Sequence, residues 1–487
     1  MAQAKGILPR RDDREVLYRN PQMCGYFVAV KLDPTIDRPR TEAWLNRVSG
    51  LVDELVARLP VEEGEEEGRK VAAVAVGLAP SFFTTDGAAR FDPPVDPPAA
   101  FSPGVLLPNA TPPLAKVPLF DADVLFYVAS VFEARVNAFV SKLAEMRPDT
   151  QAIWIERGYQ RLDDTEPFGY KDGLRNIRTQ DRPRFVFVHR DGTELDEPTW
   201  ADGGSYMVYL KILQRPDAFA ALPDDAVRDQ VIGRAKDEVG TRLDLAGQGV
   251  DPKHKPAEPP PALPPTAHVG KAGPRGPHDD TQIFRRGLPF IETTGEGQVR
   301  VGLQFCSFQA SLEQFDVVFN DWMLNRQFPP QPGGAEAGPD ALLDPARQLT
   351  VIERVGFFFV PPYHEDGLAA AIFAAPTERP RKTGRLVVHK RVVDPNDPTR
   401  RFERRGFTFQ ILDAQGQFVP NSQFTTDSTG RGISPVELEI GQSFSLQELS
   451  SPVANVQLTN TPFTMESRNQ QLRVVNQVTQ PNTPYGG

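Results

Sequence analysis

The stretch that decides the fold is residues 25–59, "GYFVAVKLDPTIDRPRTEAWLNRVSGLVDELVARL". Its first eight residues, which are apolar except for Lys31, form a strand-like run. Its second half places Trp44, Val48, Leu51 and Leu55 at spacings of three and four, which predicts a helix with one apolar face. A strand followed directly by an amphipathic helix indicates a sheet with helices packed on its surface.

The same order of elements continues along the chain and then recurs. Strand-like apolar runs and helical periodicities alternate twice, before and after residue 200. The strand-like runs lie at 70–83, 122–130, 203–213, 301–310 and 356–362, and the helical ones at 131–146, 224–240 and 313–325. This order predicts an α+β fold with two ferredoxin-like halves, about 20–200 and 201–380, which together form one domain of residues 1–380.

The sequence changes character near residue 380. Residues 381–487 consist of short alternating runs separated by turn residues, and none of these runs has helical periodicity. This pattern predicts a second domain, a small all-β immunoglobulin-like sandwich. A proline tract at 251–266 is expected to form an extended loop within the first domain.

Composition excludes several classes of function. The 487 residues are 39% hydrophobic and 24% charged, which is ordinary for a globular protein. The net charge of −10 and the absence of a basic block argue against a nucleic-acid partner. Only Cys24 and Cys306 are present, so a CxxC metal knot is excluded and a single disulfide stays open.

No window of the sequence reaches the ~20 apolar residues that a membrane-spanning helix needs. The first twenty residues also lack an apolar run of signal-peptide length. We therefore expect a cytoplasmic protein, and the alternative is a protein released or displayed at the cell surface by a non-standard route.

Two loop residues carry the chemistry of the first domain. Asp172 lies in "EPFGYKDGLRN" (166–176), and His268 lies in "AHVGKAGPRGPHDDTQIFRRGLPF" (267–290). Taken singly, an acid in a glycine-bounded turn caps its own backbone, and a loop histidine lies on the surface. These readings stay as the alternatives for both residues.

Four motifs nevertheless agree in order along the chain. They are the GxxDG turn at 169–173, GGSY at 203–206, AHVxKAxPR from residue 267 and RRGxPF from residue 285. With this set the chain resembles the dye-decolorising peroxidases, which are haem peroxidases with a duplicated ferredoxin-like fold. The resemblance extends from Gly25 to Pro362 and implies haem b as the cofactor.

The resemblance also implies roles for individual residues. His268 would be the proximal ligand of the haem iron, and its second ring nitrogen would need an acceptor that the sequence does not identify. Asp172 would lie over the opposite face of the haem as the acid–base group, with Arg285 beside it. Leu303 and Phe305, two apart on one strand and so on one face, would wall that distal pocket.

Two glycines belong to the same implied site. Gly169 and Gly173 would let the backbone approach the porphyrin where a Cβ would collide.

The implied reaction is the reduction of hydrogen peroxide at the expense of a bulky organic donor such as a dye or a phenol. A carboxylate such as that of Asp172 can move a proton from one peroxide oxygen to the other. Arg285 would stabilise the negative charge that develops on the departing oxygen and favour the ionised form of Asp172. Alternatives are a structural or interaction protein without turnover and a haem-binding protein for iron release.

Donors too large to reach the iron would pass electrons through aromatic side chains at the surface. The candidates are Trp154, Trp200, Trp322 and Tyr206. Packing in the core is the alternative for each of them.

The tail resembles the Cna protein B-type domains of surface adhesins in "GRLVVHK", "GFTFQILDAQG", "TTDSTGRG" and "QLRVVNQV". Strand parity places Lys390, Glu448 and Asn476 on the same faces as apolar neighbours, so three polar side chains point into the core. The resemblance implies an intramolecular isopeptide bond between Lys390 and Asn476, catalysed by Glu448. A buried salt bridge with a hydrogen-bonded asparagine is the alternative.

The tail is also a candidate surface for a docking partner or a homo-oligomer.

Overall fold

The structure is a computed structural model, and it describes twenty ranges of the chain. These are residues 24–56, 72–85, 88–102, 107–108, 114–130, 132–146, 150–159, 165–171, 177, 181–188, 197–237, 243, 263–273, 281–362, 364–373, 383–394, 396, 402–427, 429–465 and 469–478. Residues 251–262 of the proline tract lie outside them, as does the expected domain boundary near residue 380.

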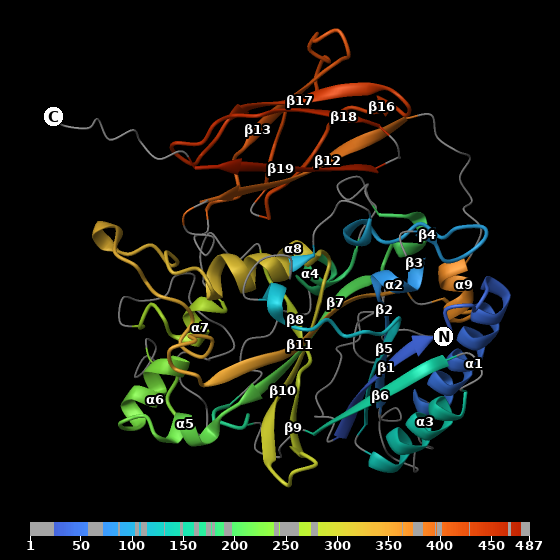
Figure 1. The fold of residues 1–487 in the computed structure, drawn as a ribbon, viewed down its shortest axis with the longest axis vertical. Helices are drawn as coiled ribbons and strands as arrows, with labels where there is room; N and C mark the ends of the chain where they lie inside the picture. Colours follow the sequence, from blue (N-terminus) through green and yellow to red (C-terminus); the bar gives the residue numbers. More distant parts are fainter. Residues whose placement is uncertain are drawn as a thin grey trace, which may run out of the picture.

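A nine-stranded antiparallel sheet forms the centre of the first domain (Figure 1). Its order is β6-β1-β5-β2-β11-β7-β10-β8, and β9 also pairs with β10. The strands are β1 Cys24–Leu32, β2 Ala72–Leu78, β5 Val124–Ser130, β6 Thr150–Tyr159, β7 Ser205–Gln214, β8 Phe284–Arg285, β9 Leu288–Thr293, β10 Val299–Gln309 and β11 Thr350–Val360. Strands from before and after residue 200 form separate halves, which join where Phe359 of β11 lies opposite Leu78 of β2.

Helices cover the outer faces of both halves, as the periodicity predicts. On the first half α1 packs through Trp44, Val48 and Leu55, which are buried with Phe126 of β5 in one apolar cluster. The helices that pack on the first half are α1 Arg38–Val56, α3 Glu133–Glu145 and α9 Leu368–Phe373. The position of α9 differs from the predicted division, which assigned residues 201–380 to the second half. The helices of the second half are α5 Pro216–Ala220, α6 Asp225–Ile232, α7 His268–Lys271, α8 Leu312–Asp316 and the π-helix η9 Val317–Met323.

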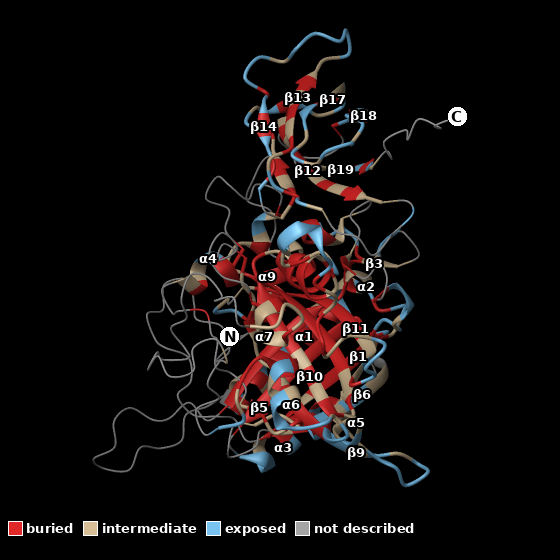
Figure 2. Cartoon of the chain, turned by 90° about the vertical axis from the view of Figure 1, so that its left-hand side faces the viewer, coloured by how far each residue is buried: buried red, intermediate tan, exposed pale blue. Residues whose placement is uncertain are grey.

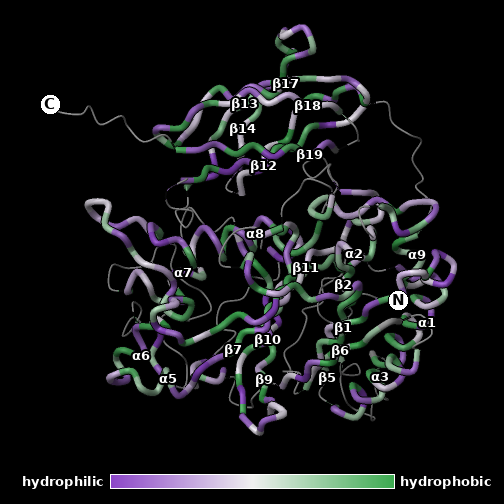
Figure 3. Tube along the Cα trace, in the orientation of Figure 1, coloured by the Kyte–Doolittle hydropathy of each residue, from purple (hydrophilic) through white to green (hydrophobic). Residues whose placement is uncertain are grey.

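The inner faces of the two halves pack against each other. Phe27 of β1 and Tyr209 of β7 belong to strands that are not neighbours in the sheet, yet their ring centroids are 4.8 Å apart. Both rings lie in a buried cluster that draws on strands of both halves. The sheet is therefore bent over on itself, and its strands are buried on two faces (Figure 2) and largely hydrophobic (Figure 3).

Several elements differ from the sequence prediction, and the helices α5 and α9 are among those that were not predicted. The strand expected at 70–83 ends at Leu78, because Pro80 starts the short helix α2. The helix expected at 224–240 ends at Ile232, where Gly233 adopts a left-handed conformation. Strand β9, which follows directly on the RRG turn, was not predicted. The remaining elements are α2 Pro80–Phe83, α4 Arg182–Val186, β3 Thr84–Thr85, β4 Ala88–Ala89 and the 3-10 turns η1 Ala99–Phe101, η3 Leu114–Lys116, η6 Thr199–Ala201 and η10 Pro332–Gly334.

The tail forms two four-stranded sheets above the first domain (Figure 1). One holds β12 between β15 and β16, with β19 parallel to β12, and the other has the order β14-β13-β17-β18. The strands are β12 Thr383–Val393, β13 Thr408–Leu412, β14 Phe424–Thr425, β15 Arg431–Ile433, β16 Leu438–Glu439, β17 Ser443–Ser450, β18 Asn460–Thr464 and β19 Asn469–Gln477. Within the described part of residues 383–478 there is no helix, as expected.

Two further expectations concern cysteines and membranes. Cys24 and Cys306 are both buried free thiols, so the disulfide that the sequence left open does not form. No helix in the described ranges is long and apolar enough to cross a membrane.

Two glycines offer a matched test of the packing. A Cβ at Gly158 of β6 would lie 2.6 Å from Leu288 Cβ, whereas a Cβ at Gly50 of α1 would meet nothing within 4 Å. We expect Gly158→Ala to lower the free energy of unfolding by about 1–3 kcal/mol through overpacking. Gly50→Ala should raise it by about 0.5–1 kcal/mol through helix propensity. Urea unfolding measures both, and equal effects of the two changes would contradict this account of the bent sheet.

Candidate functional site

A cavity of about 240 Å³ lies on the outer face of the second half and opens partly to solvent. A water molecule takes up about 30 Å³ of liquid, so the cavity accommodates a far larger group. Its floor is made by β7 and β10, where Leu303 lies opposite Ile212 and Phe305 opposite Leu210. Leu303 and Phe305 therefore share the face that the sequence predicted, and both line the cavity.

The other wall comes from the helices α7, α8 and η9. His268 and Val269 line it at the start of α7, and four apolar side chains line it from the α8–η9 helix. These four are Phe315, Val318, Phe319 and Met323. A capping box of Ser311 and Gln314 begins α8, and the chain continues as a π-helix, a form that often marks functional sites.

The acceptor that the sequence could not name for His268 is Asp340. His268 Nδ1 lies 2.9 Å from Asp340 Oδ2, and the Asp340 carboxylate is fully buried. Since a carboxylate accepts only, Nδ1 carries the proton and Nε2 is the nitrogen that would ligate a metal. The other carboxylate oxygen accepts from the Leu342 N–H at 2.9 Å, and the Asp340 N–H donates to Met323 O at 2.7 Å. No local motif marks this pair, because 72 residues separate its members.

Lys271 lies one helical turn after His268 and is fully buried. Its ammonium group donates to Asn325 O at 2.6 Å and to Trp322 O at 3.2 Å. Burial lowers the pKa of Lys271 to about 8, although Asp340 acts in the opposite direction. α7 is thereby bound to the C-terminal end of η9.

Polar and charged side chains occupy the rest of the cavity wall. Arg285 lies on β8 opposite Ser307, and it lines the cavity together with Lys171 and the buried Arg234. Gln214 Oε1 and Thr281 Oγ1 are buried at the cavity without a hydrogen-bond partner. Partnerless buried polar atoms are uncommon in native proteins, so these two indicate that the cavity receives a ligand or ordered water.

Asp172 and Gly173 lie outside the described residues. The preceding turn is described, and Glu166, Tyr170 and Lys171 line the cavity. Gly169 does not line it. Its φ of +86° is left-handed, and a Cβ there would lie 3.0 Å from the Lys236 side chain. Among the described residues, the left-handed turn conformation explains why a glycine occupies position 169. A close approach of its backbone to the cavity does not.

The aromatic candidates for electron transfer separate into two groups. Trp322 and Tyr206 are buried in the core of the second half, and Trp200 is packed against the same core. Trp154 on β6 is 38% exposed, so core packing does not describe this side chain.

Comparisons with known proteins match the same part of the chain. The family described as "Dyp-type peroxidase, C-terminal" matches residues 163–364, the segment that supplies His268, Asp340 and the cavity walls. Residues 163–364 are thus similar to the C-terminal part of Dyp-type peroxidases. Deferrochelatase from Yersinia pestis is 28% identical over 208 residues, and that from Shigella flexneri is 26% identical over 216 residues. The two alignments cover 40% of this chain and 48% and 49% of those proteins, so the chain spans about half the length of the curated relatives it matches.

Solved Dyp-type structures share the fold of the first domain. The peroxidase from Cellulomonas bogoriensis has a TM-score of 0.55 at 21% identity and covers 73% of this chain and 95% of its own. Ferric DtpA from Streptomyces lividans has a TM-score of 0.56 at 20% identity, covering 73% and 94%. A DypB variant from Rhodococcus jostii in complex with heme has a TM-score of 0.50 at 18% identity, covering 74% and 96%. These likenesses show the fold.

The burial of Lys271 at this site has a measurable consequence. Its pKa is depressed in the folded protein, so the unfolded chain binds more protons between about pH 8 and the ordinary value of 10.5. Stability should therefore rise with pH through this window, by up to about 1.4 kcal/mol per pH unit. We expect Lys271→Met to abolish the part of this rise that Lys271 contributes, measured by urea unfolding from pH 7.5 to 10. If stability rose with pH equally steeply in the variant and the wild type, the assigned role of Lys271 would be contradicted.

Proposed function

We propose that the protein is a haem-dependent peroxidase that reduces hydrogen peroxide and oxidises bulky organic donors such as dyes or phenols. The observation that carries this proposal is the His268–Asp340 pair on the helix wall of a cavity whose floor is apolar and whose remaining wall includes Arg285. A neutral imidazole held by a buried carboxylate is the arrangement that metal-ligating histidines use.

The residues of the cavity fit haem b. Apolar side chains on both walls suit a flat macrocycle, and they include Leu303, Phe305 and Val318. Lys171 and Arg234 are the cations that would bind its carboxylates. When bound, haem supplies the redox chemistry that cleaves the peroxide bond. His268 would hold it through Nε2, and Asp340 raises the basicity of that nitrogen.

The remaining steps concern protons and charge. Asp172 would accept a proton from one oxygen of hydrogen peroxide and return it to the other, so that water leaves. Arg285 would stabilise the departing oxygen and keep Asp172 ionised. Lys171, the neighbour of Asp172 in sequence, lines the cavity, which supports the placement of Asp172 near this site.

Large donors would deliver electrons at the surface. Trp154 is the exposed member of the four aromatic candidates, so we favour it over the buried Trp322 and Tyr206. We further propose that residues 1–380 form the peroxidase domain and residues 381–487 a separate tail domain, and that the protein acts in the cytoplasm.

The decisive experiment is an absorption spectrum of haem-loaded protein before and after peroxide. Wild type should show a Soret band that changes on addition of peroxide, and it should oxidise a dye. Asp172→Asn should keep the band and lose at least about 10²-fold in dye oxidation, because it removes the proton acceptor. His268→Ala should alter the band of the resting state. A wild-type protein whose haem spectrum ignores peroxide would refute the peroxidase assignment and favour a structural protein.

Iron release from haem is a second candidate function, because the curated relatives are named deferrochelatase. The two functions differ in their products. Iron release gives chelatable iron and an intact porphyrin without peroxide, whereas peroxidase turnover needs peroxide and leaves the haem iron in place. A ferrous-iron chelator in the same cuvette distinguishes them.

The tail gives structural support for the isopeptide bond. Lys390, Glu448 and Asn476 are all buried, with exposed fractions of 1%, 3% and 2%. Lys390 Nζ lies 3.0 Å from Glu448 Oε1, and Asn476 Nδ2 donates to Glu448 Oε2 at 2.7 Å. Lys390 and Asn476 come from the first and last strands of the tail, which pair in parallel with Val392 opposite Asn476.

The environment of the trio also suits amide transfer. Lys390 Nζ lies 4.9 Å from the centre of the Phe407 ring, and burial lowers the pKa of Lys390 to about 8, which raises the fraction of neutral, nucleophilic amine. Asn476 Oδ1 is buried without a partner. Rotating the amide would place this oxygen against Glu448, where a protonated carboxyl could donate to it. We propose that Lys390 attacks the Asn476 amide, ammonia leaves, and Glu448 carries the proton.

Intact mass measures this bond. We expect wild type to weigh one ammonia less than its sequence, and Glu448→Gln to have the full mass. The bond closes a loop of most of the tail, so its loss should cost roughly 4 kcal/mol of stability. A wild-type protein at full mass would instead support a buried salt bridge.

A further inference from the structure

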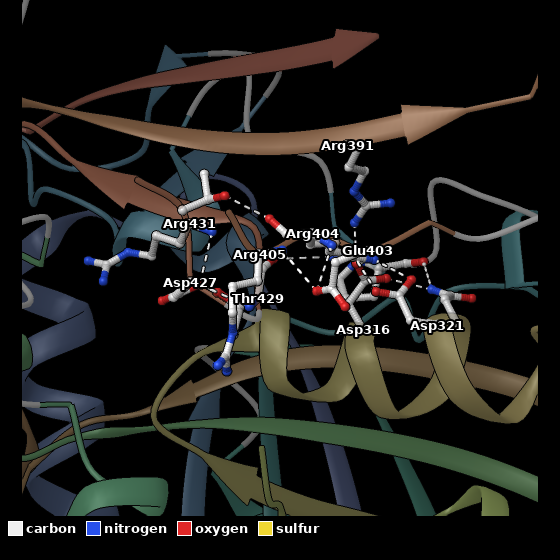
Figure 4. Close-up of polar contacts among 12 residues, drawn as sticks. Asp316, Asp321, Arg391, Glu403, Arg404, Arg405, Asp427, Thr429 and Arg431 are labelled. Carbon is white, nitrogen blue, oxygen red and sulfur yellow. Dashed lines mark hydrogen bonds and ion pairs between the residues drawn. The ribbon is translucent and has the colours of Figure 1, made fainter. Parts of the chain in front are cut away.

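The tail contacts the first domain through charged side chains that meet on the α8–η9 helix (Figure 4). Arg404 of the tail binds the Asp321 carboxylate in a two-point contact, Nη2 to Oδ1 at 2.7 Å and Nε to Oδ2 at 2.5 Å. Its Nη2 also lies 2.8 Å from Asp316 Oδ2, which Arg391 binds as well. One turn earlier, Glu313 Oε1 lies 2.9 Å from Nδ1 of His389.

This contact is a buried one. The side chains of Asp316 and Arg404 are 1% and 7% exposed, and that of Asp321 is 12% exposed. Burial favours neutral carboxyl groups, but Arg391 and Arg404 outweigh it at Asp316 and hold the pKa of this group below its ordinary value. Breaking a buried ion pair by removing one partner is strongly destabilising, since the remaining charge stays uncompensated. The tail therefore holds this helix firmly.

The same helix forms the wall of the cavity. Phe315, Val318 and Phe319 alternate along it with the acids that bind the tail, and these three side chains line the cavity. The helix is thus fixed between the tail on one side and the cavity on the other.

The C-terminal end of the α8–η9 helix binds two groups near His268, the Asp340 backbone and the Lys271 side chain. Met323 O accepts from the Asp340 N–H at 2.7 Å, and Asp340 in turn binds His268. Trp322 O and Asn325 O accept from the ammonium of Lys271, one turn after His268. A contiguous series of bonds therefore runs from Arg404 through the helix to the imidazole.

We propose that the C-terminal sandwich acts as a clamp on the α8–η9 helix, and that this clamp sets the position of Asp340 and so of the iron-binding His268. Asp316, Asp321, Arg391 and Arg404 are then positioning residues. The link to His268 as an iron ligand rests on the proposed function, whereas the hold on the helix and on Asp340 does not. Because coupling is reciprocal, filling the cavity strengthens the attachment of the tail.

The first arm of the test uses the haem-free protein. In Arg404→Met, the amides of residues 312–323 and of Asp340 should exchange with deuterium about fivefold faster or more, the lower end of usual coupling energies. Arg391→Met should act in the same direction and serves if the first variant does not fold. Ile411→Val is the matched control, because it loosens the core of the sandwich without touching the helix. Unchanged exchange in both arginine variants, or an equal effect of Ile411→Val, would overturn the proposal.

The second arm uses the haem-loaded protein. Arg404→Met should shift the iron–histidine stretching frequency of the ferrous protein and transfer haem to apomyoglobin about fivefold faster. Arg404→Lys, which keeps the charge, should restore part of both. An unchanged frequency and transfer rate, beside faster exchange of the helix, would overturn the link to His268. Failure of wild type to take up haem would instead refute the proposed function, and the first arm would still decide the clamp.

Discussion

Strands β7 and β10 are buried on both faces, and the site depends on this constraint. Tyr209 and Cys306 point to the inner face, where the two halves pack together. Leu210 and Phe305 point to the outer face and form the cavity floor. Because alternate side chains of a strand point to opposite faces, the packing that joins the halves also fixes the direction of the residues that meet a ligand.

The α8–η9 helix is the second constraint, since it contacts three parts of the molecule. It covers the sheet, it lines the cavity through Val318 and Phe319, and it binds the tail through Asp316 and Asp321. Backbone oxygens at the end of its π-helical portion and just after it, those of Trp322, Met323 and Asn325, bind Lys271 and Asp340. A single element therefore connects the two domains to the group that would hold iron. This arrangement gives the tail a physical route to the site, although no tail residue that the structure describes lines the cavity.

The tail shows how burial can assign a role to polar residues. Lys390 and Glu448 would each be costly in an apolar core if they were unpaired. Their pairing with each other, and the contact of Glu448 with Asn476, satisfies most of their polar atoms. Glu448 Oε1 is paired with the Lys390 ammonium, so Asn476 Oδ1 is the oxygen of this trio that is buried without a partner. This oxygen belongs to the amide that the proposed transfer would involve.

The sequence by itself determined the elements whose signals are local. The periodicity of Trp44 and Val48 predicted α1, and alternation around Lys390 predicted a buried lysine in a β domain. Ordered motifs predicted that His268, Arg285 and Leu303 would come together, and all three line one cavity. These signals work because a helix or a strand imposes its period on neighbouring residues.

Only the tertiary structure decided what depends on distant residues. Asp340 binds His268, 72 residues away in the sequence, and Asp321 binds Arg404, 83 residues away. No local sequence pattern identifies the partner in either pair. The end of α6 at Gly233 and the π-helical continuation of α8 were likewise set by turn geometry and packing. Such contacts form when whole helices and strands pack together. At that stage the burial of apolar surface and the pairing of charges outweigh the local conformational preference of each residue.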